Sequence, residues 1–371
     1  MPSRLRLWHN WDAQLCALLP QLRVTRVRVL ALFVLGTVWS GQLGLLRVAA
    51  TLPVSAADVS TERRFQRWLT NEGIVVPVWW QALLPALLIG KAGQEVTLVF
   101  DPTPQNGTAT ILCLSLVVHK RTLPVAWRVV PQQSAWPARQ ITYLQAMMEE
   151  VQAALPPGCV VTLVTDRGIT GPAVIDLCQA VGWHYVLRVN AGATQTGLVR
   201  LGDGTVELLW ALVTGPGQRW TGMVEVFQGV GWRDVELTIR WDPGAIEPWV
   251  LVSDRPAGGA RVREYRRRVH AEATYADAKR RGFAIERSKV TILPHLDRLL
   301  LVLHLALWWT QQLGLRVIRQ GQRRRYDRHD RRDLSVMHLG RTRMRDQLDW
   351  DDLPPLPFHR RNQQWRYAWL A

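Results

Sequence analysis

Two aspartates stand where predicted β-strands end, a position that carries functional groups in many open α/β sheets. Asp101 follows an apolar run over residues 96–100, and Asp166 follows a second run over 160–164. If the two strands are neighbours, the carboxylates lie side by side, and such hard oxygen ligands select Mg²⁺ or Mn²⁺. The alternative is a pair of ordinary turn residues, because Asp-Pro and Asp-Arg-Gly are both good turn sequences.

Four polar side chains recur at helical spacing further along the chain. They are Tyr265, Arg268, Glu272 and Lys279. Because a helix turns about 100° per residue, they fall on one stripe roughly 60° wide of a predicted helix over 262–281. A phenol, a guanidinium, a carboxylate and an ammonium group cannot form an apolar packing seam. The stripe is either part of a polar site or a solvated helix face.

The elements that must position these groups follow from hydrophobic periodicity. Three consecutive strands (95–100, 108–118 and 122–130) predict an antiparallel meander, with Asn106-Gly107 as the first turn. The order then continues as helix, strand, helix, strand, over 138–155, 160–164, 171–181 and 185–189. This order predicts an α/β fold with a mixed sheet covered by helices.

The regions around this core have a different texture. Residues 5–89 show helical spacing only, whereas 190–248 contain short segments rich in Trp and Gly, typical of a β-rich insertion. A strand over 249–253 precedes the 262–281 helix, and an apolar helix over 296–313 follows it. We therefore expect a helical N-terminal domain (1–90), an α/β core (91–190 and 249–315), the β-rich insertion (191–248) and a basic C-terminal segment (316–371).

The charge points to a polyanionic partner. The chain has forty-six Lys and Arg residues and thirty Asp and Glu residues, which gives a formal net charge of +16. Only four of the cations are lysines. Arginine grips phosphate with two parallel hydrogen bonds, so nucleic acid is the first partner to consider. A GC-rich genome would explain the preference for arginine but not the surplus. A basic helix over 60–69 fits either a DNA backbone or a solvated face packed through Phe65 and Trp68.

The cysteines and apolar runs indicate the compartment. Four cysteines without a C-x-x-C pair argue against a zinc site or a disulfide framework. The longest apolar run, 29–39, is well short of the roughly 20 residues that span a membrane, and no signal peptide is apparent. We expect a cytoplasmic, nucleoid-associated protein with no membrane partner.

With these residues in place, the chain resembles a known family. Tyr-x2-Arg-x3-Glu-x6-Lys, from Tyr265 to Lys279, is similar to the YREK signature of the IS4-type family of bacterial insertion-sequence DDE transposases. Asp101 in Phe-Asp-Pro-Thr and Asp166 in Thr-Asp-Arg-Gly resemble that family's two acidic blocks. The resemblance covers about residues 92–315, and more weakly 60–69 and 331–345.

The resemblance implies a fold, an activity and roles for individual residues. The fold would be ribonuclease-H-like, with the catalytic core over 91–190 and 249–315 and a DNA-binding domain over 1–90. Asp101, Asp166 and Glu272 would hold two Mg²⁺ or Mn²⁺ ions about 3.5–4 Å apart. The activity would be metal-dependent cleavage and strand transfer at transposon ends, in cut-and-paste transposition. Tyr265, Arg268 and Lys279 would contact DNA phosphates near the cleaved end.

The same resemblance implies the partners. These are double-stranded DNA, as transposon terminal inverted repeats and as target DNA, and a second copy of the chain in a dimer on DNA. Trp241 or Trp249 is a candidate to stack on a flipped base, although sheet packing accounts for both.

Two other functions remain open, together with one competing site residue. The chain is either an active transposase, a ribonuclease-H-like nuclease without strand transfer, or an inactive DNA-binding descendant. Asp254 also ends a predicted strand and competes with Asp166 if the sheet order differs from the one expected.

Overall fold

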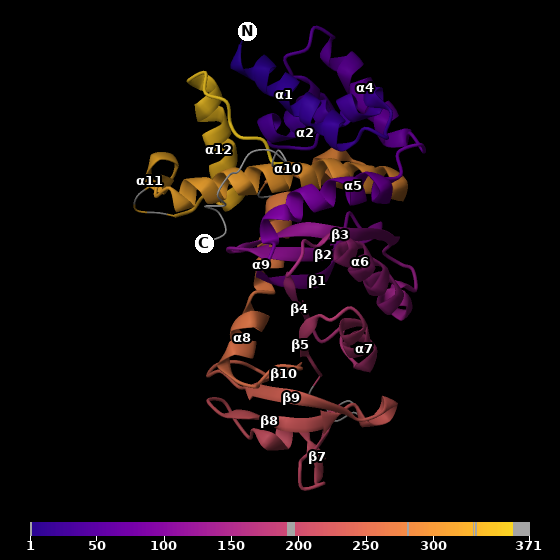
Figure 1. The fold of residues 1–371 in the computed structure, drawn as a ribbon, viewed down its shortest axis with the longest axis vertical. Coiled ribbons are helices and arrows are strands. Elements are labelled where there is room, and N and C mark those ends of the chain that lie inside the picture. The colour runs from indigo at the N-terminus through magenta and orange to yellow at the C-terminus, as the bar shows by residue number, and fades with distance from the viewer. Residues whose placement is uncertain (1, 191–196, 280–281, 329, 331, 359–371) are drawn as a thin grey trace.

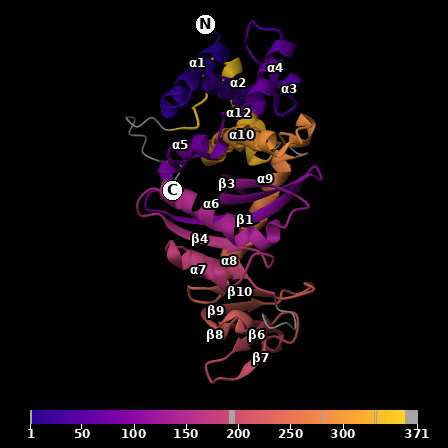
Figure 2. The same cartoon turned by 90° about the vertical axis from the view of Figure 1, so that its right-hand side faces the viewer.

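The computed structural model describes residues 2–190, 197–279, 282–328, 330 and 332–358. The molecule is elongated, with most of its helices gathered at one end and a single sheet that extends along the long axis to the other (Figure 1). In the quarter-turn view the same order holds, from α1 at one end to β7 at the other (Figure 2).

The N-terminal region is helical, as expected. Its elements are α1 (Ser3–Leu18), α2 (Val24–Ser40), α3 (Leu45–Ala49), α4 (Asp58–Thr70) and α5 (Val76–Leu88). The apolar run 29–39 lies in α2, a helix of this core. Within the described ranges, no helix is both long enough and apolar enough to cross a membrane.

The basic helix predicted over 60–69 is α4, and its aromatic residues belong to the core. Phe65 stacks on Phe33 with ring centroids 4.3 Å apart, and the Trp68 ring meets Trp79 edge-on. Arg63 and Arg64 of the same helix are exposed. The aromatic residues of α4 therefore anchor the helix to the protein and leave its arginines facing solvent.

The sheet begins with the predicted meander. Its strands are β1 (Glu95–Gln105), β2 (Ala109–Val118) and β3 (Arg121–Pro131), all antiparallel. Asn106 and Gly107 both have positive φ values, 52° and 68°, in the three-residue turn between the paired Gln105 and Ala109, where Asn and Gly tolerate left-handed backbone. The β1–β2 turn chemistry thus fixes the register in which Asp101 lies opposite Cys113.

Two parallel strands extend this meander on its other side. β4 (Val160–Thr165) pairs with β1, and β5 (His184–Arg188) pairs with β4. The connecting helices are α6 (Gln140–Ala154) and α7 (Pro172–Ala180). The resulting order β3-β2-β1-β4-β5 is the mixed, ribonuclease-H-like arrangement that the sequence predicted.

The expected insertion continues the same sheet. β6 (Leu198–Arg200), β7 (Val206–Leu208), β8 (Arg219–Val226) and β9 (Arg233–Arg240) are followed by β10 (Trp249–Ser253). β10 pairs antiparallel with both β5 and β9, so it joins the core strands to the insertion strands in one ten-stranded sheet. Residues 191–196, which the insertion was also expected to include, lie outside the described residues.

The single helix predicted over 262–281 is wrong, because the chain forms two helices. These are α8 (Gly259–Arg266) and α9 (Val269–Ala278), which cover the face of the sheet opposite α6 and α7 (Figures 1 and 2). Between them the backbone tightens: the N–H of Arg268 bonds to the carbonyl of Tyr265 at 3.0 Å, three residues back. Lys279 leaves helical geometry and ends α9. Residues 280 and 281 are not among those described.

The C-terminal region packs as helices against the N-terminal ones. α10 (Leu293–Arg319) crosses α12 (Val336–Asp349) closely, with the short α11 (Arg323–Tyr326) between them in sequence. A Cβ atom on Gly340 would lie 1.8 Å from the carbonyl oxygen of Thr310, so only glycine permits this approach.

The two ends of the described chain meet beside α10. The hydroxyl of Ser3 donates to the carbonyl of Leu348 at 2.8 Å. The Trp11 ring lies against both Trp309 and Phe358, at centroid distances of 4.8 and 5.8 Å. The helical end of the molecule is therefore built from both termini of the described chain.

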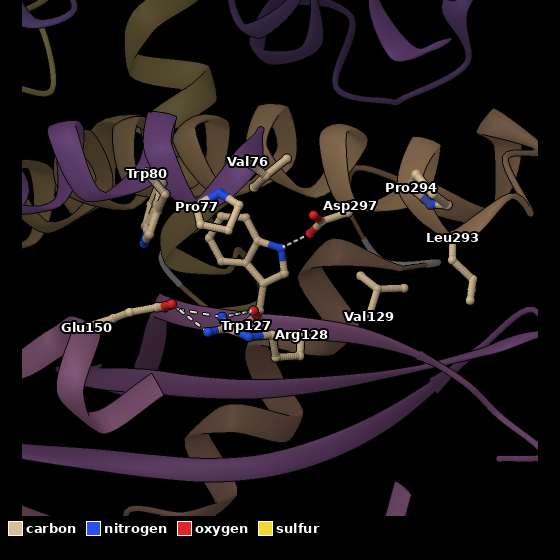
Figure 3. A pocket seen from close by; sticks show the side chains of 10 residues that line it. All are labelled: Val76, Pro77, Trp80, Trp127, Arg128, Val129, Glu150, Leu293, Pro294 and Asp297. Atoms are coloured by element: carbon tan, nitrogen blue, oxygen red, sulfur yellow. Dashed lines mark hydrogen bonds and ion pairs between the residues drawn. The ribbon is translucent and has the colours of Figure 1, made fainter. Parts of the chain in front are cut away.

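A pocket of about 290 Å³ lies where α5, α6 and α10 meet β3 (Figure 3). Inside it the indole N–H of Trp127 donates to Asp297 at 2.7 Å. His304 packs edge-on against the Trp127 ring at 4.3 Å, and complete burial lowers its pKa to about 3. His304 is accordingly a neutral packing residue.

Candidate active site

The parallel pairing of β1 and β4 brings the two predicted aspartates together. Phe100 lies opposite Thr165 in that register, so the next residues, Asp101 and Asp166, stand beside each other. The expectation that Asp101 ends its strand is wrong, because β1 continues to Gln105 through its pairing with β2. Asp166 does follow the last residue of β4.

Arg268 links all three predicted acids. Its Nη1 lies 3.3 Å from Asp101 Oδ1, and its Nη2 lies 3.8 Å from Asp166 Oδ2. The same Nη2 is 3.2 Å from Oε1 of Glu272, one helical turn further on. The tightened turn between α8 and α9 places the guanidinium beside Asp101 of β1 and Asp166, which follows β4. Three carboxylates separated by 65 and 106 residues in sequence thus surround one cationic group.

Tyr265 approaches the second aspartate from the other side of the turn. Its hydroxyl donates to Asp166 Oδ1 at 2.9 Å, and its ring packs edge-on against Trp249 at 4.9 Å. Burial and the charge of Asp166 raise the pKa of Tyr265 to about 12, so the phenol remains a hydrogen-bond donor. Of the two tryptophans considered from the sequence, Trp249 borders this group, whereas Trp241 packs against Trp210.

The two aspartates have opposite electrostatic environments. Burial raises the pKa of Asp101 to about 6. The positive charge of Arg268 acts to lower this pKa, and the negative charges of Glu272 and Asp166 act to raise it further. Burial also acts to raise the pKa of Asp166, but the backbone N–H of Arg167 and the Arg268 guanidinium outweigh it and lower that pKa. Neighbouring carboxyl groups whose pKa values are driven apart are characteristic of functional sites.

Lys279 does not join the group around Arg268. Its ammonium donates to the carbonyl of Pro104 at 2.6 Å and to the Thr103 hydroxyl at 3.2 Å, on the part of β1 beyond Asp101. The reason is that α9 ends at Ala278, so Lys279 no longer follows the helical stripe on which it was expected.

Sequence reasoning missed two residues next to the acids. Arg188, the last residue of β5, has its Nη1 3.7 Å from Asp166 Oδ1 and also pairs with Glu247. Arg188 lies near the end of the strand predicted over 185–189, so attention to strand ends would have indicated its neighbourhood. Tyr275 donates from its hydroxyl to the backbone carbonyl of Asp101 at 3.1 Å. Its position ten residues after Tyr265 gave no comparable signal.

Asp254, the competing acid, lies at the opposite ends of the strands from Asp166. Because β10 runs antiparallel to β5, the end of β10 meets the beginning of β5. There Asp254 accepts hydrogen bonds from the backbone N–H of Tyr185 at 3.1 Å and interacts with His184 at 2.6 Å. Asp166, and not Asp254, shares the neighbourhood of Asp101.

The donor chemistry around Arg268 fits a hard divalent cation, since three carboxylates converge where a positive charge already sits. In the present arrangement the guanidinium occupies that place. Correspondingly, no group of three or more His, Cys, Asp or Glu side chains in the described chain is disposed to hold a metal ion. The carboxylates thus match such a cation in chemistry while being spread around Arg268.

Comparison with known proteins gives one family. The family model described as "Transposase DDE domain" matches residues 114–309, more than half of the chain. Asp166 and Glu272 fall inside that range and Asp101 lies just before it. A cryo-EM structure of a piggyBac transposase synaptic complex with hairpin DNA is similar at 10% sequence identity and a TM-score of 0.46, over 96% of this chain and 84% of that one. No curated protein matches the chain significantly.

Proposed function

This chain belongs to the transposase DDE domain family and is a DNA transposase, and from that premise we propose that Asp101, Asp166 and Glu272 form its catalytic centre. The reaction would be cleavage and strand transfer of transposon ends in cut-and-paste transposition. The observation that carries the proposal is the convergence of the three carboxylates on Arg268, at 3.3, 3.8 and 3.2 Å.

Transposases of this family generally use divalent metal ions. We propose that Asp101, Asp166 and Glu272 hold two Mg²⁺ or Mn²⁺ ions. The chemistry that two such ions supply is activation of the attacking hydroxyl and stabilisation of the leaving oxygen in an in-line displacement. The protein itself fixes the carboxylates: Tyr265 and the backbone N–H of Arg167 both donate to Asp166, and the pairing of β1 with β2 and β4 holds Asp101.

The cationic and phenolic residues beside the acids position the substrate in this proposal. Arg268 and Lys279 carry charges that attract DNA phosphates, and Tyr265 offers a hydroxyl that remains protonated at neutral pH. These residues, with Glu272, make up the YREK pattern, which supports an IS4-type enzyme. Their contacts to carboxylates and carbonyls in the free protein would be exchanged for phosphate contacts on DNA.

The partner of this enzyme is DNA. We propose that it recognises the terminal inverted repeats of its element and joins them to target DNA as a dimer, on nucleoid DNA in the cytoplasm. The helical end of the molecule exposes Arg63 and Arg64 on α4, which supports a DNA-binding role for residues 1–90.

The inactive-descendant alternative is less favoured by the site. Loss of function commonly leaves one catalytic position substituted, whereas all three acids and their Tyr, Arg and Lys neighbours are present here. A nuclease without strand transfer would use the same carboxylates, so strand transfer has to be assayed separately.

The test is Mg²⁺-dependent nicking of a duplex that carries the element's own terminal repeat. Glu272→Gln retains size and hydrogen bonding but removes a charge that would hold metal. Nicking should therefore fall by orders of magnitude while end binding persists, because each increase of about 1.4 kcal/mol in the activation free energy slows the reaction tenfold. The matched control is Glu149→Gln, on the exposed face of α6. Equal nicking by Glu272→Gln and wild type would remove Glu272 from the site. Tight end binding without nicking by wild type would favour the inactive descendant.

A further inference from the structure

A second polar cleft lies outside the group of carboxylates. It has a volume of about 590 Å³ and opens between the β2–β3 turn, the end of α10, α11 and the start of α12. Figure 1 shows α11 at the end of the helical layer opposite α4, on the side of the molecule that carries α8 and α9. The cleft is therefore separate from the exposed arginines of α4.

The lining of this cleft is strongly basic. Its permanent cations are Lys120, Arg121, Arg323, Arg324, Arg328 and Arg332. The described lining contains only two carboxylates, and Asp327 is already paired with Arg323 at 2.9 Å. Burial together with the neighbouring Lys and Arg charges lowers the pKa of His119 at the cleft wall. The cleft thus has a positive potential that its own acids do not neutralise.

The cleft walls are held in place before any ligand binds. Arg323 also donates to the backbone carbonyls of Arg332 and Leu334, at 3.2 and 3.0 Å, which closes the loop between α11 and α12. Ser335 caps the N-terminus of α12 by accepting from the backbone N–H of His338. The positive end of that helix dipole therefore faces the cleft and adds to its attraction for anions.

One wall of the cleft is joined directly to the helix that carries Glu272. Arg121 pairs with Asp277 of α9 at 2.9 Å, and the Thr274 hydroxyl accepts from the backbone N–H of Thr122 at 2.7 Å. Because β3 and α9 are tied in this way, a polyanion seated in the cleft has a fixed position relative to the candidate active site.

We propose that this cleft binds the phosphate backbone of duplex DNA outside the scissile end. The inference rests on the proposed function and deepens it, because it assigns a DNA contact to residues 119–121, 323–328 and 332 that the carboxylate group does not provide. Stabilisation of the C-terminal end of α10 does not account for the charge, since one helix end carries only about half an elementary charge. The six cations of the lining exceed its two carboxylates by four, and by three when the pairing of Arg121 with Asp277 is included.

The test measures binding of a random-sequence DNA duplex by fluorescence anisotropy at several salt concentrations, in the absence of divalent metal. The variant is Arg324→Gln/Arg328→Gln, because both side chains are exposed and have no ion-pair partner among the described residues. The control is Arg139→Gln/Arg219→Gln, which removes the same charge from exposed positions outside the cleft.

The cleft variant should bind the duplex on the order of tenfold more weakly, and its slope of log affinity against log salt should fall by about 1.8, or 0.9 for each lost phosphate contact. The control pair should change both quantities far less. Equal losses in the two pairs would overturn the inference, because affinity would then follow net charge alone.

Two further arms separate the possible sources of failure. If the cleft variant loses binding of inorganic tripolyphosphate but retains duplex binding, the site takes a small polyphosphate and the DNA inference is wrong. If wild type nicks its terminal repeat and the cleft variant binds duplex as wild type does, this inference fails while the proposed function stands. If wild type neither binds duplex nor nicks, the proposed function itself fails.

Discussion

The guanidinium of Arg268 lies 3.3 Å from the carboxylate of Asp101, at the centre of the three acids proposed to hold metal. A divalent cation and this guanidinium therefore draw on the same oxygens. Replacing Arg268 by Gln removes a competing positive charge, so the DNA-free protein should bind Mn²⁺ at least several-fold more tightly, measured by electron paramagnetic resonance titration. DNA nicking should fall nevertheless, because a phosphate contact is lost.

The control for this experiment is Arg266→Gln. Arg266 precedes Arg268 by two residues but pairs with Asp242, away from the acids. Its replacement should leave Mn²⁺ affinity unchanged. An Arg268→Gln protein that binds Mn²⁺ no better than wild type would show that the guanidinium does not compete with metal.

Tyr265→Phe tests the hydrogen bond to Asp166. The ring and its contact with Trp249 are retained, while the 2.9 Å hydrogen bond is lost. Nicking should fall roughly 10- to 100-fold, the range seen when a partner that orients a metal ligand is removed. Thermal unfolding should change little. Tyr143→Phe, which removes a hydroxyl on α6 at the opposite face of the sheet, is the control and should nick normally.

Gly340→Ala tests the crossing of α10 and α12. A Cβ at this position would lie 1.8 Å from the backbone carbonyl of Thr310, and a backbone atom cannot yield as a flexible side chain does. We expect a loss of about 3 kcal/mol or more in the free energy of unfolding, measured by urea denaturation. Gly202→Ala, which meets open space, should unfold like wild type.

His304 should make the stability depend on pH. Its pKa is lowered to about 3 in the folded protein, against an ordinary value of 6.5, so between these values the unfolded chain binds more protons than the folded one. Stability should therefore decrease as the pH falls below 6.5, by up to about 1.4 kcal/mol per pH unit from this residue. His304→Phe retains a ring beside Trp127 and should remove that part of the slope. Parallel pH profiles of the two proteins would contradict this assignment.

Much of the fold was predictable because its signals are local. The Asn106-Gly107 turn and the apolar runs before Asp101 and Asp166 define the meander and the parallel strands without reference to distant residues. The break between α8 and α9 was not predictable, because helix propensity continues through Arg267 and Arg268. The interactions at the break are tertiary contacts with the sheet. Arg267 donates a hydrogen bond to Thr97 on β1, and Arg268 forms an ion pair with Asp101.

The candidate site was predictable in its acids and less so in its surroundings. The prediction that the strands before Asp101 and Asp166 are neighbours brings the two aspartates together, although Asp101 does not end its strand. Arg188, near the end of the next predicted strand, is adjacent to Asp166. The position of Lys279 depended on the assumption of a continuous helix and was wrong for that reason. The aromatic residues of α4 were ambiguous because amphipathic spacing cannot distinguish a nucleic-acid contact from a core contact. Their burial in the structure identifies them as core.

The meeting of Ser3 and Trp11 with Leu348 and Phe358 has a consequence for synthesis on the ribosome. Among the described elements, α1 and α2 are made before the others, but Phe358, which covers Trp11, is made hundreds of residues later. Until that residue is made, the core around Trp11 lacks its contact with Phe358. The contacts that complete this helical end therefore form only after the carboxylate-bearing strands and helices have been made.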